Sequence, residues 1–189
     1  MSRTRELFER ACQQFGGKVA AIKDDQWGDS TPCTDWDVRA LVNHLAYENA
    51  WIPPLLGGRT IADVGDTLDG DLLGEDPKGA WQQRADEAAA AVAEDGVLDR
   101  MVRISRGLVL GGEYVFEVMA DLVIHGWDLA QAIGLDTTID PELLDVVYPY
   151  YEPLVALLKR TGAFGPVVEP PDGADRQTVL LAMLGRQAW

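Results

Sequence analysis

The segment EVMADLVIHGWDLAQAIG, residues 117–134, contains the strongest indication of how this chain is organised. Apolar residues cover nearly every side of a helix drawn through it, which is typical of a helix enclosed by other elements. Gly134 follows the last apolar position and is a plausible C-cap, because glycine adopts the left-handed conformation that often ends a helix. The pattern therefore predicts a central helix over residues 113–133.

Further helices are predicted on both sides of this segment, joined by loops rich in glycine and proline. Apolar residues at helical spacing indicate a first helix over residues 2–22, and an alanine-rich stretch indicates another over 78–94. Pro141 suits the first turn of a helix that we expect to run to residue 160. A short closing helix is expected within residues 174–187.

A well-marked helix start lies in TPCTDWDVRALVNHL, residues 31–45. Thr34 is a good N-cap residue, and an acidic residue, Asp37, follows three positions later, as at many helix starts. We expect Pro53 and Pro54 to stop or kink this helix, because proline lacks an amide hydrogen and clashes with the preceding turn.

Two segments do not follow a helical pattern. Residues 53–77 read as a long loop, and residues 97–112 suggest short extended pieces. The fold class that follows is all-α: a four-helix bundle of long antiparallel helices with short extra helices. A length of 189 residues suits one domain, so we expect a single helical-bundle domain over residues 1–189.

The composition argues against several partners and compartments. With a formal net charge of -15, neither nucleic acid nor an anionic membrane surface is an expected partner. No apolar run approaches the roughly 20 residues that cross a bilayer, and the N-terminus is charged rather than signal-like, so we expect a cytoplasmic protein. Cys12 and Cys33 are then expected to be free thiols. Cys33, just before a helix start, could act as a nucleophile, although a buried apolar role is commoner.

The chain has two histidines, and both fall within predicted helices. His44 lies on the second helix, whereas His125 lies on the central helix four residues after Asp121, so that these last two side chains share one face. Two imidazoles and a carboxylate make three metal ligands and leave a position for an exchangeable ligand, which is the pattern of a catalytic metal site. A carboxylate inside a bundle also needs a partner or a cation, because burying it alone is costly.

Two further acidic residues lie near this set. Glu48 is one turn beyond the first histidine, and Asp128 shares the face of Asp121, so either could orient a metal-bound imidazole. The spacing also permits a metal-free alternative, in which Asp121 and His125 form a buried hydrogen-bonded pair, or Asp121 pairs with an arginine such as Arg103.

The motifs TPCTDWDVRALVNHL and DLVIHGWDLAQAIG together resemble those of the DinB-like, mycothiol-dependent maleylpyruvate isomerase N-terminal superfamily. The closest resemblance is to its short single-bundle branch of metal-binding proteins. The resemblance extends to GDLLGEDPKGAW and LLAMLGR, residues 70–81 and 180–186, so it spans nearly the whole chain.

This resemblance implies that His44, Asp121 and His125 bind a divalent metal, either zinc or another ion such as nickel. The family's isomerase has glutamate at the position of Asp121, and aspartate remains a hard oxygen donor. That isomerase also carries an additional C-terminal domain that contributes to its active site, whereas this chain ends with the bundle. The resemblance therefore implies the metal site more directly than the isomerisation.

The implied function is a metal-dependent transferase or isomerase that uses mycothiol, or another small thiol, to act on a small electrophile. Coordination would deprotonate that thiol. Two alternatives use the same three ligands: a hydrolase that activates a bound water, and a non-catalytic, metal-stabilised binding module. A homodimer also stays open, because bundles of this kind often dimerise through a helix face.

Overall fold

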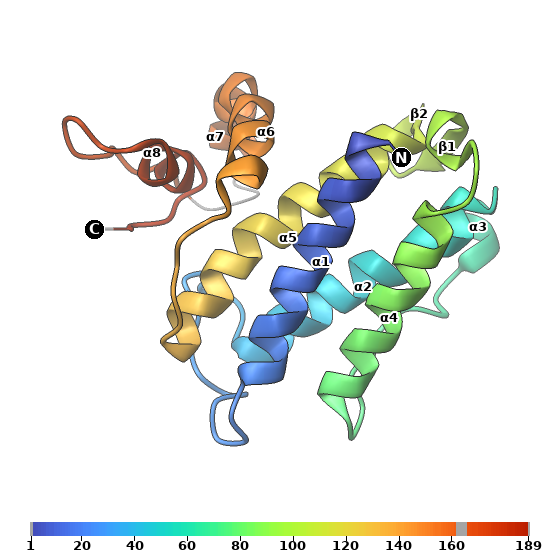
Figure 1. The fold of residues 1–189 in the computed structure, drawn as a ribbon, viewed down its shortest axis with the longest axis horizontal. Coiled ribbons are helices and arrows are strands. Elements are labelled where there is room, and N and C mark those ends of the chain that lie inside the picture. The colour runs from blue at the N-terminus through green and yellow to red at the C-terminus, as the bar shows by residue number, and fades with distance from the viewer. Residues whose placement is uncertain (1, 162–165, 189) are drawn as a thin grey trace.

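The computed structural model describes residues 2–161 and 166–188. Its main body is four long helices: α1 (Arg3–Ala21), α2 (Val38–Leu56), α4 (Pro77–Val92) and α5 (Gly111–Ile133). α1 and α2 each contact both α4 and α5, so the four helices form a closed ring around one apolar core (Figure 1). The packing confirms the predicted all-α bundle.

Most of α5 is buried, as its apolar sequence predicts. Met119, Ile124 and Leu129 are fully enclosed by the neighbouring helices. Gly134 ends α5 with φ 72° and ψ 36°, and its amide donates to the carbonyl of Ala130. The central helix and its glycine C-cap are therefore both confirmed, and this helix supplies a rigid base for side chains that face α2.

The start of α2 differs from the expectation. Asp37, not Thr34, is the N-cap, because the Asp37 side chain accepts a hydrogen bond of 2.8 Å from the amide of Ala40. Thr34 lies three residues earlier, in the turn that precedes the helix. A bridge to Ser30 holds Asp37 in the extended conformation that a cap requires, and its carboxylate is favourable at the positive end of the helix dipole.

Pro53 and Pro54 do not stop α2 at once, since the helix continues through both and ends at Leu56. Their carbonyl oxygens accept hydrogen bonds from the amides of Gly57 and Arg59, which close the end of the helix.

The loop predicted over residues 53–77 contains this end of α2 and a short helix, α3 (Ile61–Val64). Thr60 and Asp63 cap α3 reciprocally, because each side chain accepts a hydrogen bond from the backbone amide of the other residue. A capping box was therefore present in a segment where apolar periodicity was too short to indicate a helix.

The extended pieces predicted over residues 97–112 are confirmed. A 3-10 turn, η1 (Val97–Asp99), leads into an antiparallel hairpin of β1 (Met101–Ile104) and β2 (Gly107–Leu110). The hairpin joins α4 to α5 at the end of the bundle where the N-terminus also lies (Figure 1).

The helix predicted over residues 141–160 is interrupted. α6 (Pro141–Tyr151) is followed by a 3-10 turn, η2 (Glu152–Leu154), and then by α7 (Val155–Thr161). Pro153 lies within η2 and lacks the amide hydrogen that a continuous helix would need there.

The predicted closing helix is α8 (Arg176–Met183), which begins at Asp175 as N-cap and packs against α6. Figure 1 shows α6, α7 and α8 together beside the four-helix ring. Residues 162–165, which precede α8, lie outside the described residues.

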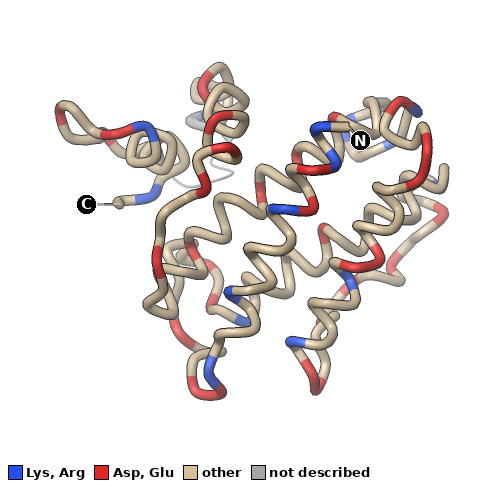
Figure 2. Tube along the Cα trace, in the orientation of Figure 1, with Lys and Arg blue, Asp and Glu red and all other residues tan. Residues whose placement is uncertain are grey.

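In the described part of the chain, no helix combines the length and apolar character needed to span a membrane. Acidic residues recur in the loops at both ends of the ring (Figure 2).

Candidate metal centre

His44 and Asp121 meet where α2 packs against α5. His44 Nε2 lies 2.9 Å from Asp121 Oδ2. His125, one helical turn after Asp121, has its Nε2 3.4 Å from the other oxygen, Oδ1. One donor atom from each of these residues lies within 4.8 Å of the other two. The structure therefore brings together the three residues predicted as ligands.

The donor set fits a divalent cation. Zinc binds imidazole nitrogen and carboxylate oxygen at about 2.0–2.2 Å, which places neighbouring donors of a tetrahedron about 3.4 Å apart. The His125–Asp121 distance of 3.4 Å matches that spacing, whereas the His44–Asp121 distance of 2.9 Å is shorter and is that of a hydrogen bond. The side chains of His44 and Asp121 are 25% and 19% exposed, whereas that of His125 is 4% exposed, so the cluster opens to solvent on one side. An exchangeable ligand could enter from that side.

Asp128 and Arg186 support His125 from behind. Asp128 Oδ2 lies 2.9 Å from His125 Nδ1, on the far edge of the imidazole from the cluster. Arg186 donates from Nε to Asp128 Oδ1 at 3.1 Å and from Nη2 to Oδ2 at 2.6 Å. Its Nη1 donates to the carbonyl of Leu184 at 2.6 Å. A carboxylate behind a histidine fixes its tautomer and orientation, which is the arrangement common behind metal ligands.

The contacts that link His125, Asp128 and Arg186 involve most of the buried polar residues of the described chain. Among the described residues, the buried polar or charged ones are Thr31, Asn49, His125, Asp128 and Arg186, so three of the five belong to it. Burying an ion pair is costly unless its groups are fully hydrogen-bonded. The two hydrogen bonds from Arg186, one to each carboxylate oxygen of Asp128, meet that condition.

Burial, charges and hydrogen bonds around the cluster shift the pKa values of Asp121, His44 and Asp128. Burial opposes ionisation of Asp121, but the charge of His125 and the hydrogen bond from His44 hold the pKa of Asp121 below its usual value. Burial also opposes protonation of His44, yet the hydrogen bond to Asp121 and the nearby charge of Glu48 raise the pKa of His44. For Asp128, bonds from His125 and Arg186 outweigh burial and lower the pKa.

Trp36, from the loop before α2, covers the two imidazoles. Its ring centroid lies 4.5 Å from that of His44 and 5.4 Å from that of His125. Trp81, by contrast, packs against Phe15 with centroids 4.6 Å apart.

A pocket of about 270 Å³ adjoins the cluster at Asp121. We call it the inner pocket; its lining residues are Glu48, Tyr114, Glu117, Val118, Asp121, Tyr150, Tyr151 and Leu154. Glu48 thus lies beside the cluster, and burial together with the charge of Asp121 raises its pKa. No hydrogen bond between Glu48 and a predicted ligand is found among the described residues, so its position is that of a pocket wall.

A second, more open pocket of about 600 Å³ shares Glu117 and Tyr150 with the first. This outer pocket lies at the hairpin end of α5 and includes Phe116 and Glu113. Arg106, from the turn of the hairpin, binds both carboxylate oxygens of Glu117. Glu117 and Tyr150 therefore form a wall common to the two pockets.

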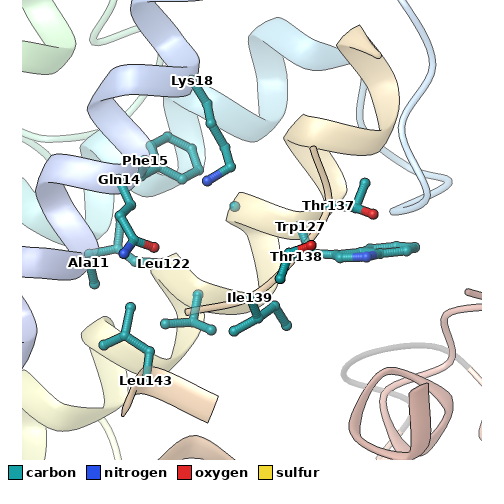
Figure 3. Close-up of a pocket in the computed structure, with 12 residues that line it drawn as sticks. Ala11, Gln14, Phe15, Lys18, Leu122, Trp127, Thr137, Thr138, Ile139 and Leu143 are labelled. Carbon is teal, nitrogen blue, oxygen red and sulfur yellow. The ribbon is translucent and has the colours of Figure 1, made fainter. Parts of the chain in front are cut away.

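The small cavity in Figure 3 is a different feature. It is lined by α1, α5 and the segment after α5, including Phe15, Leu122 and Ile139, and measures about 20 Å³. That volume is close to what one water molecule needs, so the cavity is too small for a substrate.

Two sequence-based alternatives do not match the structure. Arg103 is exposed on β1, and the arginine of the buried network is Arg186, which pairs with Asp128. Sequence reasoning missed Arg186, although an arginine within the apolar LLAMLGR was a usable signal. Burial raises the pKa of the Cys33 thiol, which disfavours the thiolate that a nucleophile requires.

Comparisons with known proteins found similar sequences and similar folds. A family described as mycothiol maleylpyruvate isomerase N-terminal domain matches residues 8–130. Uncharacterized proteins from two strains of Mycobacterium tuberculosis are each 31% identical over 140 residues, covering 71% of this chain and 70% of the relative.

Two solved structures share the fold. A histidine-to-alanine mutant of mycothiol-dependent maleylpyruvate isomerase superposes with a TM-score of 0.60, and another structure of that isomerase with 0.53, both at 13% identity. Each superposition covers 77% of this chain but 66% of the isomerase chain, just under two-thirds of its length.

Proposed function

The chain belongs to the mycothiol maleylpyruvate isomerase N-terminal domain family, and on that basis we propose a divalent-metal-dependent enzyme that uses mycothiol as a thiol co-substrate. Its reaction would be the addition or transfer of that thiol to a small electrophile, as a transferase or an isomerase. The single observation that carries the proposal is the convergence of three donor atoms within 4.8 Å beside a pocket.

In this proposal His44, Asp121 and His125 hold the cation, with zinc as the preferred ion. When bound, a divalent cation supplies positive charge that lowers the pKa of a thiol ligand, so that the thiolate forms at neutral pH. Asp128 keeps the imidazole of His125 turned toward the cluster, and Arg186 holds Asp128 in place. The thiol proton would pass to solvent, to which the side chain of His44 is partly exposed.

The nucleophile has to arrive with the co-substrate, because neither protein thiol is suited to the role. Burial raises the pKa of Cys12 to about 12, and burial also raises the pKa of Cys33. A thiolate is the reactive form, so both side chains are poor nucleophiles at neutral pH. The inner pocket is the place for the electrophile, because Asp121 belongs to both the cluster and the pocket wall.

Metal analysis of protein purified without a tag or chelator tests the first part of the proposal. We expect about one divalent ion per chain in the wild type and loss of that ion in both His44→Ala and His125→Ala. Glu94→Gln, an exposed substitution far from the cluster in sequence, is the control and should keep the ion. Equal trace metal in all four proteins would refute the site.

A thermal-shift and turnover comparison separates the reactions. Stabilisation by mycothiol only in the metal-loaded protein, with thiol-dependent turnover, supports the thiol enzyme. Hydrolysis of simple esters or amides without thiol would replace it with a hydrolase that activates water. Metal-dependent stability with neither activity would leave a non-catalytic binding module.

A further inference from the structure

The inner pocket is rich in carboxylates and tyrosines. Glu48, Glu117 and Asp121 contribute acidic side chains, and three tyrosines surround them. Of all the described residues, no lysine, arginine or histidine lines either the inner or the outer pocket. A substrate that enters therefore meets negative charge and hydroxyl groups.

Two arginines around the site, Arg106 and Arg186, are already paired. Arg106 binds both carboxylate oxygens of Glu117, which leaves the pair close to neutral. Arg186 is buried and binds Asp128 with two of its nitrogens. Neither guanidinium is positioned to bind the carboxylate of a ligand without giving up an existing ion pair.

The remaining charges come close to cancelling once the proposed cation is included. Two positive charges offset Asp121 and Glu48, and the thiolate of the co-substrate then adds one negative charge. A carboxylate on the electrophile would add a second negative charge, and no cationic side chain among the described lining residues would offset it. Like charges a few ångströms apart in a partly buried site repel strongly.

The pocket also offers hydrogen bonding for an uncharged group. Tyr114 lines the inner pocket, is buried, and its hydroxyl has no hydrogen-bond partner among the described residues. A buried hydroxyl without a partner is costly, so a ligand that accepts its hydrogen bond gains affinity. Carbonyl and nitro oxygens are acceptors of this kind and carry no net charge.

We infer that the inner pocket selects a small uncharged electrophile with an acceptor oxygen and discriminates against carboxylates, with Glu48 as the specificity-determining residue. This inference rests on the proposed function. A dicarboxylate is therefore not the expected electrophile of this chain, because it would place two negative charges in a pocket whose wall already holds three carboxylates.

A matched pair of electrophiles tests the inference in turnover. The neutral probe is 2-chloro-1,3-dinitrobenzene, and 4-chloro-3,5-dinitrobenzoate is the same ring with a carboxylate opposite the chlorine. In each reaction the thiolate sulfur forms a bond to the carbon that bears chlorine, and chloride leaves with the electron pair. The thiol proton goes to solvent.

With zinc-loaded full-length protein and mycothiol, we expect kcat/KM, corrected for the uncatalysed rate, to favour the neutral probe by about tenfold or more. The preference should shrink in Glu48→Gln and shrink further or reverse in Glu48→Lys. The control is Glu94→Gln, which also removes one carboxylate but at an exposed position. Its ratio of kcat/KM for the two probes should equal that of the wild type.

A binding measurement distinguishes failure of the inference from failure of the thiol reaction. Calorimetry with the unreactive pair 3,5-dinitrobenzamide and 3,5-dinitrobenzoate needs no turnover. Tighter binding of the amide, with a ratio that falls in Glu48→Gln, supports the pocket preference even if no thiol transfer occurs. Equal affinities in the wild type, a ratio unchanged in Glu48→Gln, or binding of neither ligand would overturn it.

Discussion

Arg186 donates hydrogen bonds to both carboxylate oxygens of Asp128, which is 58 residues earlier in the chain. Both side chains are buried. Asp128 in turn contacts the ring of His125. The segment after α8 therefore determines how a candidate metal ligand on α5 is oriented.

Removal of that guanidinium should affect both stability and metal binding. Arg186→Ala leaves a buried carboxylate without its partner, and we expect a loss of about 3–5 kcal/mol in the free energy of unfolding. Zinc affinity should fall by about 10–100-fold, because the carboxylate behind His125 loses its support. Urea unfolding and a competitive chelator assay measure the two effects.

The control for this variant is Arg176→Ala, since Arg176 pairs with Asp145 on the surface. Exposed pairs contribute about 0–1 kcal/mol, so this change should be nearly silent in both assays. Equal effects of the two substitutions would contradict the role assigned to Arg186.

Stability of the metal-free protein should depend on pH through His44. Its folded-state pKa is raised above the ordinary 6.5, so the folded state binds this proton more tightly than the unfolded chain. The contribution to stability is complete below pH 6.5 and is lost as the pH rises through the folded-state pKa. His44→Gln lacks this titration, so its urea midpoint should stay flatter over the same range. Parallel curves for the two proteins would disprove the expectation.

Asp121 should make the stability of the metal-free protein depend on pH in the acid range. Its pKa is held below the ordinary 3.8, so its contribution is present above pH 3.8 and is lost as the pH falls through the folded-state value. We expect Asp121→Asn to unfold with a weaker acid dependence than wild type in the metal-free state. A matched loss of acid dependence in Asp24→Asn, an exposed site in the turn after α1, would show that the effect is not specific to the cluster.

The hydroxyl of Tyr114 should contribute little to folding. It is buried without a hydrogen-bond partner among the described residues, so Tyr114→Phe removes a desolvation cost without breaking a bond. Thermal unfolding should give a melting temperature equal to or above that of wild type, while affinity for 3,5-dinitrobenzamide falls. A strongly destabilised variant would mean that the hydroxyl has an essential partner in the folded state.

The start of α2 can be tested with a pair of substitutions. Asp37→Ala removes the side chain that accepts the amide of Ala40 and should cost about 0.5–2 kcal/mol in chemical unfolding. Thr34→Ala changes the residue that the sequence favoured and should cost less, because Thr34 lies in the preceding turn. The reverse order of effects would place the cap at Thr34.

The parts of this molecule that were predictable are those encoded locally. Apolar periodicity and Gly134 identified α5, and the four-residue spacing of Asp121 and His125 placed both side chains on one face. Both Thr34 and Asp37 are good caps, and the choice between them depends on the bridge to Ser30, which spacing does not reveal.

Other features depend on contacts between distant segments. The pairing of Arg186 with Asp128 has no period and no short-range signature. The interruption of the predicted helix over residues 141–160 depends on how the chain bends at Pro153, and proline alone does not specify whether a helix kinks or breaks.

The position of Arg186 has a consequence for protein synthesis. All three proposed ligands lie at or before residue 125, yet the guanidinium that orients one of them leaves the ribosome only after residue 186 has been translated. Chains are synthesised at about 5–20 residues per second. The two histidines and the aspartate are therefore present in the nascent chain for several seconds before Arg186 is added. If the ribosome stalled in this interval, the nascent chain would contain the three proposed metal ligands without the arginine that orients His125.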